Sequence, residues 1–364
     1  MPNNFDLAGL ALKSECPSND LLFDDKGFPS AMVFIPKMTY AQLGLGTSTA
    51  TFPAFLVNGS EVDGIWISKY LNVVNNGRGY SLPGVGPGNN MDFDEARSYC
   101  EAKGSGWHLM TALEWGALIL WCEANGHIPL GNNNYGKHSS ESNYVAIPDN
   151  KDASHYAYRT KTGTGPLTWS HDKTPSGIMD LCGNVWEWTG GIRLVKGEVQ
   201  VLTNNNAADS DKSQGASSAE WKAIDATTGE LITPNGSGTT SNSVKMDYQN
   251  SKLTYHTSIT ASQGGAGLDT EFNCEFKNIT KSASVADAAA LVLQALGMYP
   301  KASTSIPTNN VCYWRPFQDE RCLFRGGNCS STAGGFASFY AYNPRSYRGG
   351  HVGFRAAYIQ LPAA

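Results

Sequence analysis

The chain has 364 residues, of which 41% are hydrophobic, and it carries a formal net charge of −5. This length and hydrophobic fraction suffice for a core in one large domain or two ordinary ones, and they exclude a disordered chain. The acidic balance offers no basic field to attract nucleic acid, so nucleic acid is not an expected partner.

The sequence shows no targeting or membrane-spanning segment. No stretch approaches the ~20 consecutive apolar residues of a membrane span. The first residues, MPNNFDLAGLALKSECPSND, lack the basic leader and long apolar stretch of a signal peptide. We therefore expect synthesis in the cytoplasm. The eight cysteines include no C-x-x-C pair, so we expect buried free thiols in place of disulfides or zinc sites.

A polar lead over residues 1–30, interpreted as an attachment arm, precedes the first expected strands. The runs AMVFIPKMTY (31–40) and GIWISKYLNV (64–73) are rich in β-branched and aromatic residues. Such runs are typical of strands. The glycine-rich SLPGVGPGNN (81–90) is expected to be a loop.

Two helices are expected, over 91–104 and 107–126. Each has a capping residue followed three positions later by a glutamate, and a glycine at its end. These residues are Asp92, Glu95 and Gly104 in the first helix, and Thr111, Glu114 and Gly126 in the second.

Irregular structure is expected over 127–177, and a change of composition follows the aromatic run GNVWEW (183–188). Between 194 and 310, 46 of 117 residues are Ser, Thr, Asn or Gly. This segment has few of the large apolar residues needed for a core of its own, so we expect an insertion and not a separate domain. One helix is expected within it, over 284–297 with Ser284 as its cap.

The C-terminal segment 312–352 differs again. Nine of its 41 residues are Phe, Tyr or Trp, against 11% aromatic residues in the whole chain. Tyrosine supplies a large contact area at low entropic cost, and Gly and Ser adapt to a partner. The composition is therefore typical of a binding surface.

GNVWEW (183–188) resembles the signature of the formylglycine-generating-enzyme/sulfatase-modifying-factor superfamily. The other landmarks of that superfamily follow in chain order: AMVFIPKMTY as the opening strand, MDFDEARSYCEAKG and WHLMTALEWGALILWC as its two helices, and FRGGNC (324–329) and GFRAA (353–357) as the closing strands. The resemblance implies an α+β chain with a C-type lectin-like fold. The expected domain covers 31–364, with two helices, short mixed strands, much irregular loop and the insertion 194–310.

Several landmark residues are expected to maintain the fold. Two tryptophans two positions apart share one face of a strand, an asparagine after a glycine suits a tight turn, and two arginines are expected to bridge loops to carboxylates or carbonyls through their forked guanidinium groups. These structural residues are Asn184, Trp186, Glu187, Trp188, Arg325 and Arg355, with Glu187 as the expected partner of an arginine.

The resemblance to the oxidases of the superfamily fails at their metal site. Those enzymes hold copper with a closely spaced cysteine pair shortly before the Gly-Phe-Arg motif, and soft thiolates suit Cu(I). Here no cysteine follows Cys329, and Cys322 lies seven positions earlier. No motif of nucleophilic, metalloprotease or nucleotide-binding enzymes is present either. We expect no enzyme, no catalytic residue, no metal and no cofactor; Asp and Asn residues are compatible with a structural Ca²⁺, but no ligand spacing indicates one. The alternative is a metal-dependent oxidoreductase of this superfamily.

A narrower resemblance is to the variable proteins of diversity-generating retroelements, which are non-enzymatic ligand-binding proteins of this superfamily. In them a C-terminal segment ending at Gly-Phe-Arg-Ala-Ala is rewritten, mainly at asparagine-type codons. That resemblance implies a variable region over 312–357, and residues of the corresponding types recur at every second position near the C-terminus. The recurring residues are Tyr340, Tyr342, Tyr347, Gly349 and His351, and they alternate with Phe339, Ala341, Arg348, Gly350 and Val352.

Alternation in a strand sends successive side chains to opposite faces, so one face could stay constant against the core while the other meets ligand. Two earlier patches, at 315–317 and 329–331, are expected to join that surface, with the Cys329 side chain exposed. Arg348 is included although alternation alone places it on the other face. The candidate ligand contacts are Arg315, Pro316, Phe317, Cys329, Ser330, Ser331, Tyr340, Tyr342, Tyr347, Arg348, Gly349 and His351.

The sequence thus predicts a receptor-recognition protein that binds protein or glycan ligands on a cell surface and is itself displayed on a phage particle or cell surface. Two other hypotheses remain: a structural particle protein, and a lectin-like core in which the tyrosines are ordinary strand residues.

Overall fold

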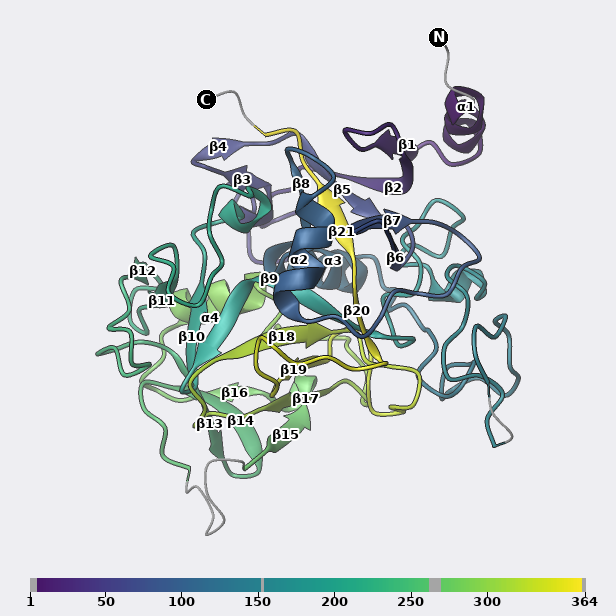
Figure 1. Cartoon of the computed structure of the whole chain (residues 1–364). Helices are drawn as coiled ribbons and strands as arrows, with labels where there is room; N and C mark the ends of the chain where they lie inside the picture. Colours follow the sequence, from purple (N-terminus) through teal and green to yellow (C-terminus); the bar gives the residue numbers. More distant parts are fainter. Residues whose placement is uncertain (1–4, 152–153, 262–269, 362–364) are drawn as a thin grey trace.

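The computed structural model describes residues 5–151, 154–261 and 270–361. Two β-sheets pack around helices, which confirms the expected α+β class (Figure 1). The helices are α1 (Phe5–Glu15), α2 (Phe93–Glu101), α3 (Ala112–Ala124) and α4 (Asp287–Ala295). In the view of Figure 1, α2 and α3 lie between the two sheets.

The smaller sheet contains the first and the last strand of the described chain. Its order is β1 (Asn19–Phe23), β2 (Pro29–Pro36), β5 (Gly64–Ser68), β21 (Ala356–Tyr358) and β8 (Trp107–Leu109). Strand β1 pairs with β2 in antiparallel register, so the sheet begins within the polar lead and before residue 31.

The larger sheet has twelve strands. Its main path is β15 (Phe272–Glu275), β17 (Val311–Trp314), β19 (Phe339–Ala341), β18 (Arg321–Arg325), β9 (Trp186–Val195), β10 (Glu198–Val201), β13 (Lys245–Gln249), β14 (Lys252–His256) and β16 (Thr280–Lys281). Off this path, β11 (Lys222–Ile224) pairs with β10 and β12 (Leu231–Ile232), and β20 (Val352–Phe354) pairs with β9. Two hairpins complete the strands: β3 (Leu56–Val57) with β4 (Ser60–Glu61), and β6 (Asn72–Asn75) with β7 (Arg78–Ser81).

Both expected capping boxes are present. The Asp92 side chain accepts from the Glu95 amide at the start of α2, and Thr111 and Glu114 make the same reciprocal pair at the start of α3. Each box satisfies two backbone amides that a helix start would otherwise leave unpaired. The expected cap of α4 was wrong: its N-cap is Ala286, without a side-chain hydrogen bond.

The insertion 194–310 is part of the main core. Its strands extend the larger sheet beyond β9, and Val199, Ile224, Met246 and Leu253 are all fully buried in the same hydrophobic cluster as α3. The polar residues that set this segment apart in composition therefore lie mostly in the turns between its strands.

The two sheets meet at Arg355, between β20 in the larger sheet and β21 in the smaller one. The fully buried guanidinium binds both carboxylate oxygens of Glu187 at 2.9 and 3.0 Å, and donates to the carbonyl oxygens of Ser68 and Met179. One side chain thus connects β9, the end of β5 and the loop before β9, because its forked donors reach three segments at once.

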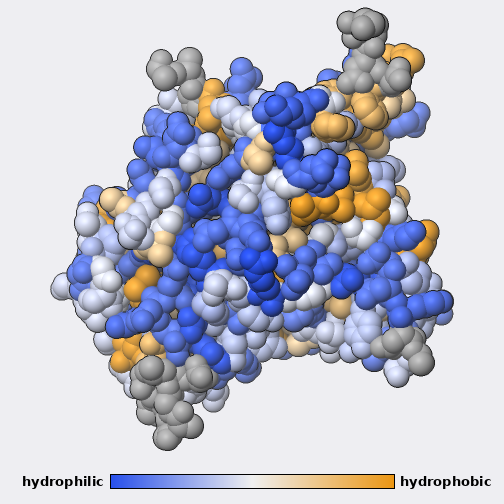
Figure 2. All heavy atoms as spheres, viewed as in Figure 1, coloured by the Kyte–Doolittle hydropathy of each residue, from blue (hydrophilic) through white to orange (hydrophobic). Residues whose placement is uncertain are grey.

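The N-terminal helix protrudes from this body (Figure 1). In α1 only Gly9 is buried, while Leu7 is 76% and Leu10 is 65% exposed. Figure 2 shows apolar atoms gathered over α1 on an otherwise mostly hydrophilic face. Within the described part of the chain, no helix has the length and apolar character needed to cross a bilayer.

Candidate ligand-binding cleft

Three neighbouring strands of the larger sheet position the centre of the site. Tyr340 on β19 lies opposite Tyr313 of β17 and opposite Phe324 of β18. Phe339 and Ala341, on either side of Tyr340, are fully buried, whereas Tyr340 and Tyr342 are half-buried. The expected alternation is therefore confirmed over 339–342, because β19 is a strand with one face in the core.

Beside Tyr340 the surface is hollowed by a cleft of about 290 Å³. Its lining comes from four separate parts of the chain: β9, β17, β18 with the loop that follows it, and β19 with the C-terminal loop. The lining residues are Trp186, Tyr313, Phe324, Asn328, Ser330, Ser331, Tyr340, Asn343, Tyr347 and His351. Five of the twelve candidate ligand contacts line it, namely Ser330, Ser331, Tyr340, Tyr347 and His351.

Aromatic rings form the wall of the cleft around Tyr340. The Tyr340 and Phe324 rings stack with centroids 5.8 Å apart and 11° between their planes. The ring centroids of Trp186 and Tyr313 lie 5.5 and 5.1 Å from that of Tyr340, and the Tyr347 centroid lies 5.9 Å from that of Phe324. Offset and tilted pairs at these separations are favourable, so the rings hold one another in place before any ligand arrives.

The second expected alternation, over 347–352, was wrong. Residues 342–351 form a loop and not a strand, and Arg348 and Gly350 are more exposed than Tyr347, Gly349 and His351. Proline at 344 has no amide hydrogen to donate to a strand ladder, and Tyr347 N–H instead closes a turn onto the Pro344 carbonyl. Tyr347 and His351 still reach the cleft because the loop folds back over it.

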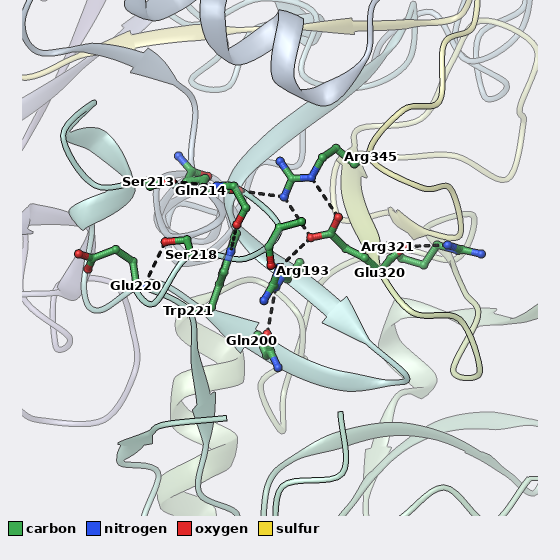
Figure 3. Close-up of polar contacts among 12 residues, drawn as sticks. Arg193, Gln200, Ser213, Gln214, Ser218, Glu220, Trp221, Glu320, Arg321 and Arg345 are labelled. Carbon is green, nitrogen blue, oxygen red and sulfur yellow. Dashed lines mark hydrogen bonds and ion pairs between the residues drawn. The ribbon is translucent and has the colours of Figure 1, made fainter. Parts of the chain in front are cut away.

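An arginine cluster holds this loop in place (Figure 3). The Arg345 guanidinium makes two hydrogen bonds to the Glu320 carboxylate, both 3.0 Å, and donates to Asp94 at 2.7 Å and to the Gln214 carbonyl at 2.8 Å. Arg193 on β9 donates to the same Glu320 at 2.8 Å. Burial raises and these two arginines lower the pKa of Glu320, which stays below its ordinary value.

Four of the remaining candidate contacts lie outside the cleft. The Arg315 guanidinium lies 3.3 Å from the centre of the Tyr342 ring, a cation–π contact. Pro316 is buried, and the Phe317 ring packs edge-on against Phe272. These four residues, Arg315 to Phe317 and Tyr342, lie beyond Tyr340 on the β17 side and can meet only a ligand larger than the cleft.

Arg348 and Gly349 lie in the C-terminal loop, also outside the lining of the cleft. Arg348 is exposed and donates to Asp92 at 2.9 Å and to Glu95 at 2.7 Å, both at the start of α2. The Gly349 carbonyl accepts from the Asn90 amide at 3.0 Å. Both residues therefore connect the loop to the start of α2.

Cys329 is buried, with 4% of its surface exposed, so the expected exposure of its side chain was wrong. Burial raises the pKa of the Cys329 thiol to about 11 and that of the Cys322 thiol to about 12. Both side chains are therefore protonated thiols at neutral pH. Among the residues that the structure describes, no group of three or more His, Cys, Asp or Glu side chains is placed to hold a metal ion.

The expected structural residues lie where fold maintenance requires them. Asn184 has a φ of +66° and exchanges hydrogen bonds with the backbone of Thr160. Arg325 is fully buried and donates to the carbonyls of Leu296 and Gly297, at the C-terminal end of α4, where a cation is favourable. Burial lowers the pKa of Arg325 to about 10, so it remains charged at neutral pH.

The paired tryptophans share a buried cluster, as expected, but they differ in role. Trp188 is fully buried and its indole N–H donates to the Met91 carbonyl at 3.0 Å. Trp186, predicted to be structural, also lines the cleft. Its backbone amide donates to the His351 carbonyl at 2.8 Å, so β9 directly supports the loop.

Four lining residues were not predicted: Tyr313, Phe324, Asn328 and Asn343. Tyr313 alternates with buried Cys312 and Trp314, a pattern that would have indicated an outward-facing side chain. Phe324 and Asn328 lie in the segment FRGGNC, which was interpreted as a closing strand, and Asn343 lies in the C-terminal loop. Only the packing of β18 beside β19 brings these three to the cleft.

Comparison with known proteins yields distant structural likenesses. No protein-family model and no curated protein matches the chain. The solved structures include "Major Tropism Determinant U1 Variant" (12% identity, TM-score 0.32, covering 90% of this chain), PvdO from Pseudomonas aeruginosa (12%, 0.32, 94%) and Treponema denticola variable protein 1 (12%, 0.33, 94%). This chain spans 63% of the first of these structures, 98% of the second and 99% of the third. At these identities and TM-scores, the likenesses decide neither the family nor the function of this chain.

Proposed function

We propose that the chain is a non-enzymatic ligand-recognition protein, of the retroelement-diversified, C-type lectin-like kind that its sequence motifs resemble. The cleft beside Tyr340 carries this proposal. It gathers aromatic and small polar side chains of a type typical of recognition surfaces, and most come from the C-terminal segment. The ligand class is a protein or a glycan on a cell surface.

The division between framework and recognition residues supports the proposal. The residues that connect the sheets, such as Arg355 and Trp188, are fully buried, whereas Tyr340, Tyr347 and His351 are half-buried at the cleft. A half-buried side chain has buried only part of its apolar area on folding. The remaining exposed area can still be buried by a ligand. The half-buried residues of the cleft are therefore the ones whose type can change while the fold is kept.

Display on a phage particle or cell surface is part of the same proposal. In Figure 1, α1 lies at the opposite end of the molecule from β17 and β19, which flank the cleft. The exposed Leu7 and Leu10 of α1 provide apolar area for attachment at that end. A protein anchored there would present the cleft away from its support.

Binding of the fluorescently labelled protein to a panel of intact bacterial cells, measured by flow cytometry, tests the proposal. We expect binding to at least one strain, and a loss of at least tenfold in Tyr347→Ala and Tyr342→Ala. The matched control is Tyr358→Ala, since Tyr358 is also half-buried but lies in the smaller sheet against Trp107. Equal loss in all three variants, or unfolding of the first two, would contradict the proposal.

A further inference from the structure

The cleft is lined by aromatic and neutral polar groups alone. Trp186, Tyr313, Phe324, Tyr340 and Tyr347 supply rings, and Asn328, Ser330, Ser331, Asn343 and His351 supply hydrogen-bonding groups. Burial lowers the pKa of His351, so the imidazole is neutral at physiological pH. No lining side chain of the described cleft then carries a charge.

This lining is poorly suited to a charged ligand group. A carboxylate, phosphate or ammonium entering the cleft would lose water without meeting an opposite charge in the lining, which is unfavourable. The nearby arginines are already engaged: Arg345 with Glu320, and Arg348 with Asp92 and Glu95. Arg315 lies over Tyr342 and outside the lining.

A purely apolar ligand group suits the lining no better. It would cover the five neutral polar side chains and leave them without the water that they bind in the free protein. The groups that match the lining therefore combine a flat C–H face, for contact with a ring, and several uncharged hydroxyls, for the amides, hydroxyls and imidazole around it.

We infer that the cleft binds an uncharged hexopyranose ring, at the end of or within a cell-surface glycan. The inference rests on the proposed function and names its ligand class. The cleft of about 290 Å³ lies at the small end of ligand-binding sites, which suits one ring and not an extended chain. The sugar face lies on the aromatic wall of Tyr340 and Tyr347. The hydroxyls exchange hydrogen bonds with Asn328, Asn343 and His351, each of which can donate or accept.

Titration with simple sugars tests the inference directly. The probes are the methyl glycosides of glucose, galactose, mannose and N-acetylglucosamine, with glucuronic acid and N-acetylneuraminic acid as charged counterparts. Binding is followed by indole fluorescence, because Trp186 lines the cleft, and by saturation-transfer NMR. We expect at least one neutral glycoside to bind with a Kd of about 1 mM and at least tenfold more tightly than either acid.

Two variants locate that binding. Asn343→Leu keeps the number and branching of the side-chain heavy atoms but removes the hydrogen-bonding groups, and Tyr347→Ala removes part of the aromatic wall. Each is expected to weaken binding of the neutral glycoside at least fivefold, while Tyr358→Ala leaves that binding unchanged. Thermal melting shows whether each variant is folded. A variant that does not fold is replaced by Ser331→Ala, which removes a half-buried hydroxyl from the same lining. Binding that persists in the cleft variants, or no binding of any neutral glycoside, would overturn the inference.

Cell binding separates this inference from the proposed function. If periodate oxidation of the cell glycans abolishes Tyr347-dependent cell binding, the ligand is a glycan, and the sugar titration then decides whether the bound ring is uncharged. If oxidation has no effect while Tyr347→Ala still abolishes binding, the cleft recognises a protein, so the proposed function stands and the inference fails. If neither treatment affects cell binding, both fail.

Discussion

Arg355 and Arg348, seven positions apart, illustrate how burial decides what an arginine contributes. Arg355 is fully buried and holds Glu187 through two hydrogen bonds, while Arg348 pairs with Asp92 and Glu95 at the surface. An unpaired buried carboxylate is strongly unfavourable, whereas exposed pairs are screened by water. The two arginines therefore differ in their effect on stability although their bond lengths are similar.

Replacement of each arginine by methionine tests this difference. We expect Arg355→Met to lower the free energy of unfolding by about 3–5 kcal/mol, because Glu187 stays buried without its partner. Arg348→Met is the control and is expected to leave the free energy of unfolding nearly unchanged, because water screens an exposed pair. Urea unfolding followed by tryptophan fluorescence measures both; equal losses would contradict the assignment.

His171 makes stability depend on pH. Its side chain is buried, its Nδ1 accepts from the Ile178 amide at 2.9 Å, and burial lowers its pKa to about 4. In the unfolded chain the imidazole titrates near pH 6.5. Between these values the unfolded state binds more protons than the folded state, so stability is lost as pH falls from 6.5 towards 4. The full loss is about 3 kcal/mol.

His171→Asn isolates that contribution. The asparagine oxygen replaces Nδ1 as the acceptor for Ile178 but does not titrate. Urea unfolding at pH 7, 5.5 and 4.5 should show a smaller acid-induced loss in the variant than in the unchanged protein. A loss of stability with acid that is identical in both proteins would show that another group is responsible.

At the scale of elements, the C-terminal loop 342–351 depends on side-chain anchors more than on a strand ladder. Arg345 connects it to Glu320 and the backbone at Gln214 (Figure 3). Arg345 also donates to Asp94, and the Phe93 amide donates to the Arg345 carbonyl at 3.1 Å. A ligand that meets a loop already held in place loses less conformational entropy on binding. On the proposed function, the anchors would therefore favour recognition as well as folding.

Arg345→Lys should loosen this loop while keeping the positive charge, because lysine lacks the planar fork. We expect hydrogen exchange of the Phe93 and Tyr347 amides to quicken about tenfold, corresponding to the loss of roughly 1.5 kcal/mol of local stability. Exchange in α3, which does not contact Arg345, should be unchanged. If these two amides exchange at the same rate in the variant and in the wild-type protein, the backbone alone holds the loop in place.

The sequence predicted elements well where a local physical signal was sufficient. Capping residues located α2 and α3, and alternation at 339–342 located the outward face of β19. Prediction from the sequence failed where the position of a residue depends on contacts with residues that are distant in the sequence. The loop 342–351 follows from its contacts with α2 and the β17–β18 turn, and Cys329 is buried because residues far away in the sequence, including Tyr135, cover its segment. Likewise Phe324 and Asn328 reach the cleft only through the pairing of β18 with β19.

At the scale of the whole molecule, the proposed attachment helix α1 is set apart from the proposed recognition cleft. The exposed helix α1 contributes one buried residue, Gly9, and packs on the edge strand β1. Loss of so little buried surface costs little stability. The fold and the cleft should thus be independent of α1.

Removal of residues 1–15 tests this independence. We expect the melting temperature to fall by no more than about 4 °C and sugar and cell binding to be unchanged, since β1 and its pairing with β2 remain. Calorimetry and flow cytometry measure the two effects. If the shortened protein does not fold, or if it folds but does not bind, then α1 is needed for the fold or for binding.

The central claim is that recognition residues can change without loss of the fold. Saturation mutagenesis of residues 312–357 tests it most directly. Yeast-surface display reports folding of each variant, and labelled cells or sugars report its binding. Substitutions at Tyr342, Tyr347, Gly349 and His351 should alter binding but keep display close to the wild-type level. Substitutions at Trp314, Arg325 and Arg355 should abolish display. If substitutions at the first four positions abolish display as completely as those at the last three, these recognition residues belong to the framework, which would contradict the claim.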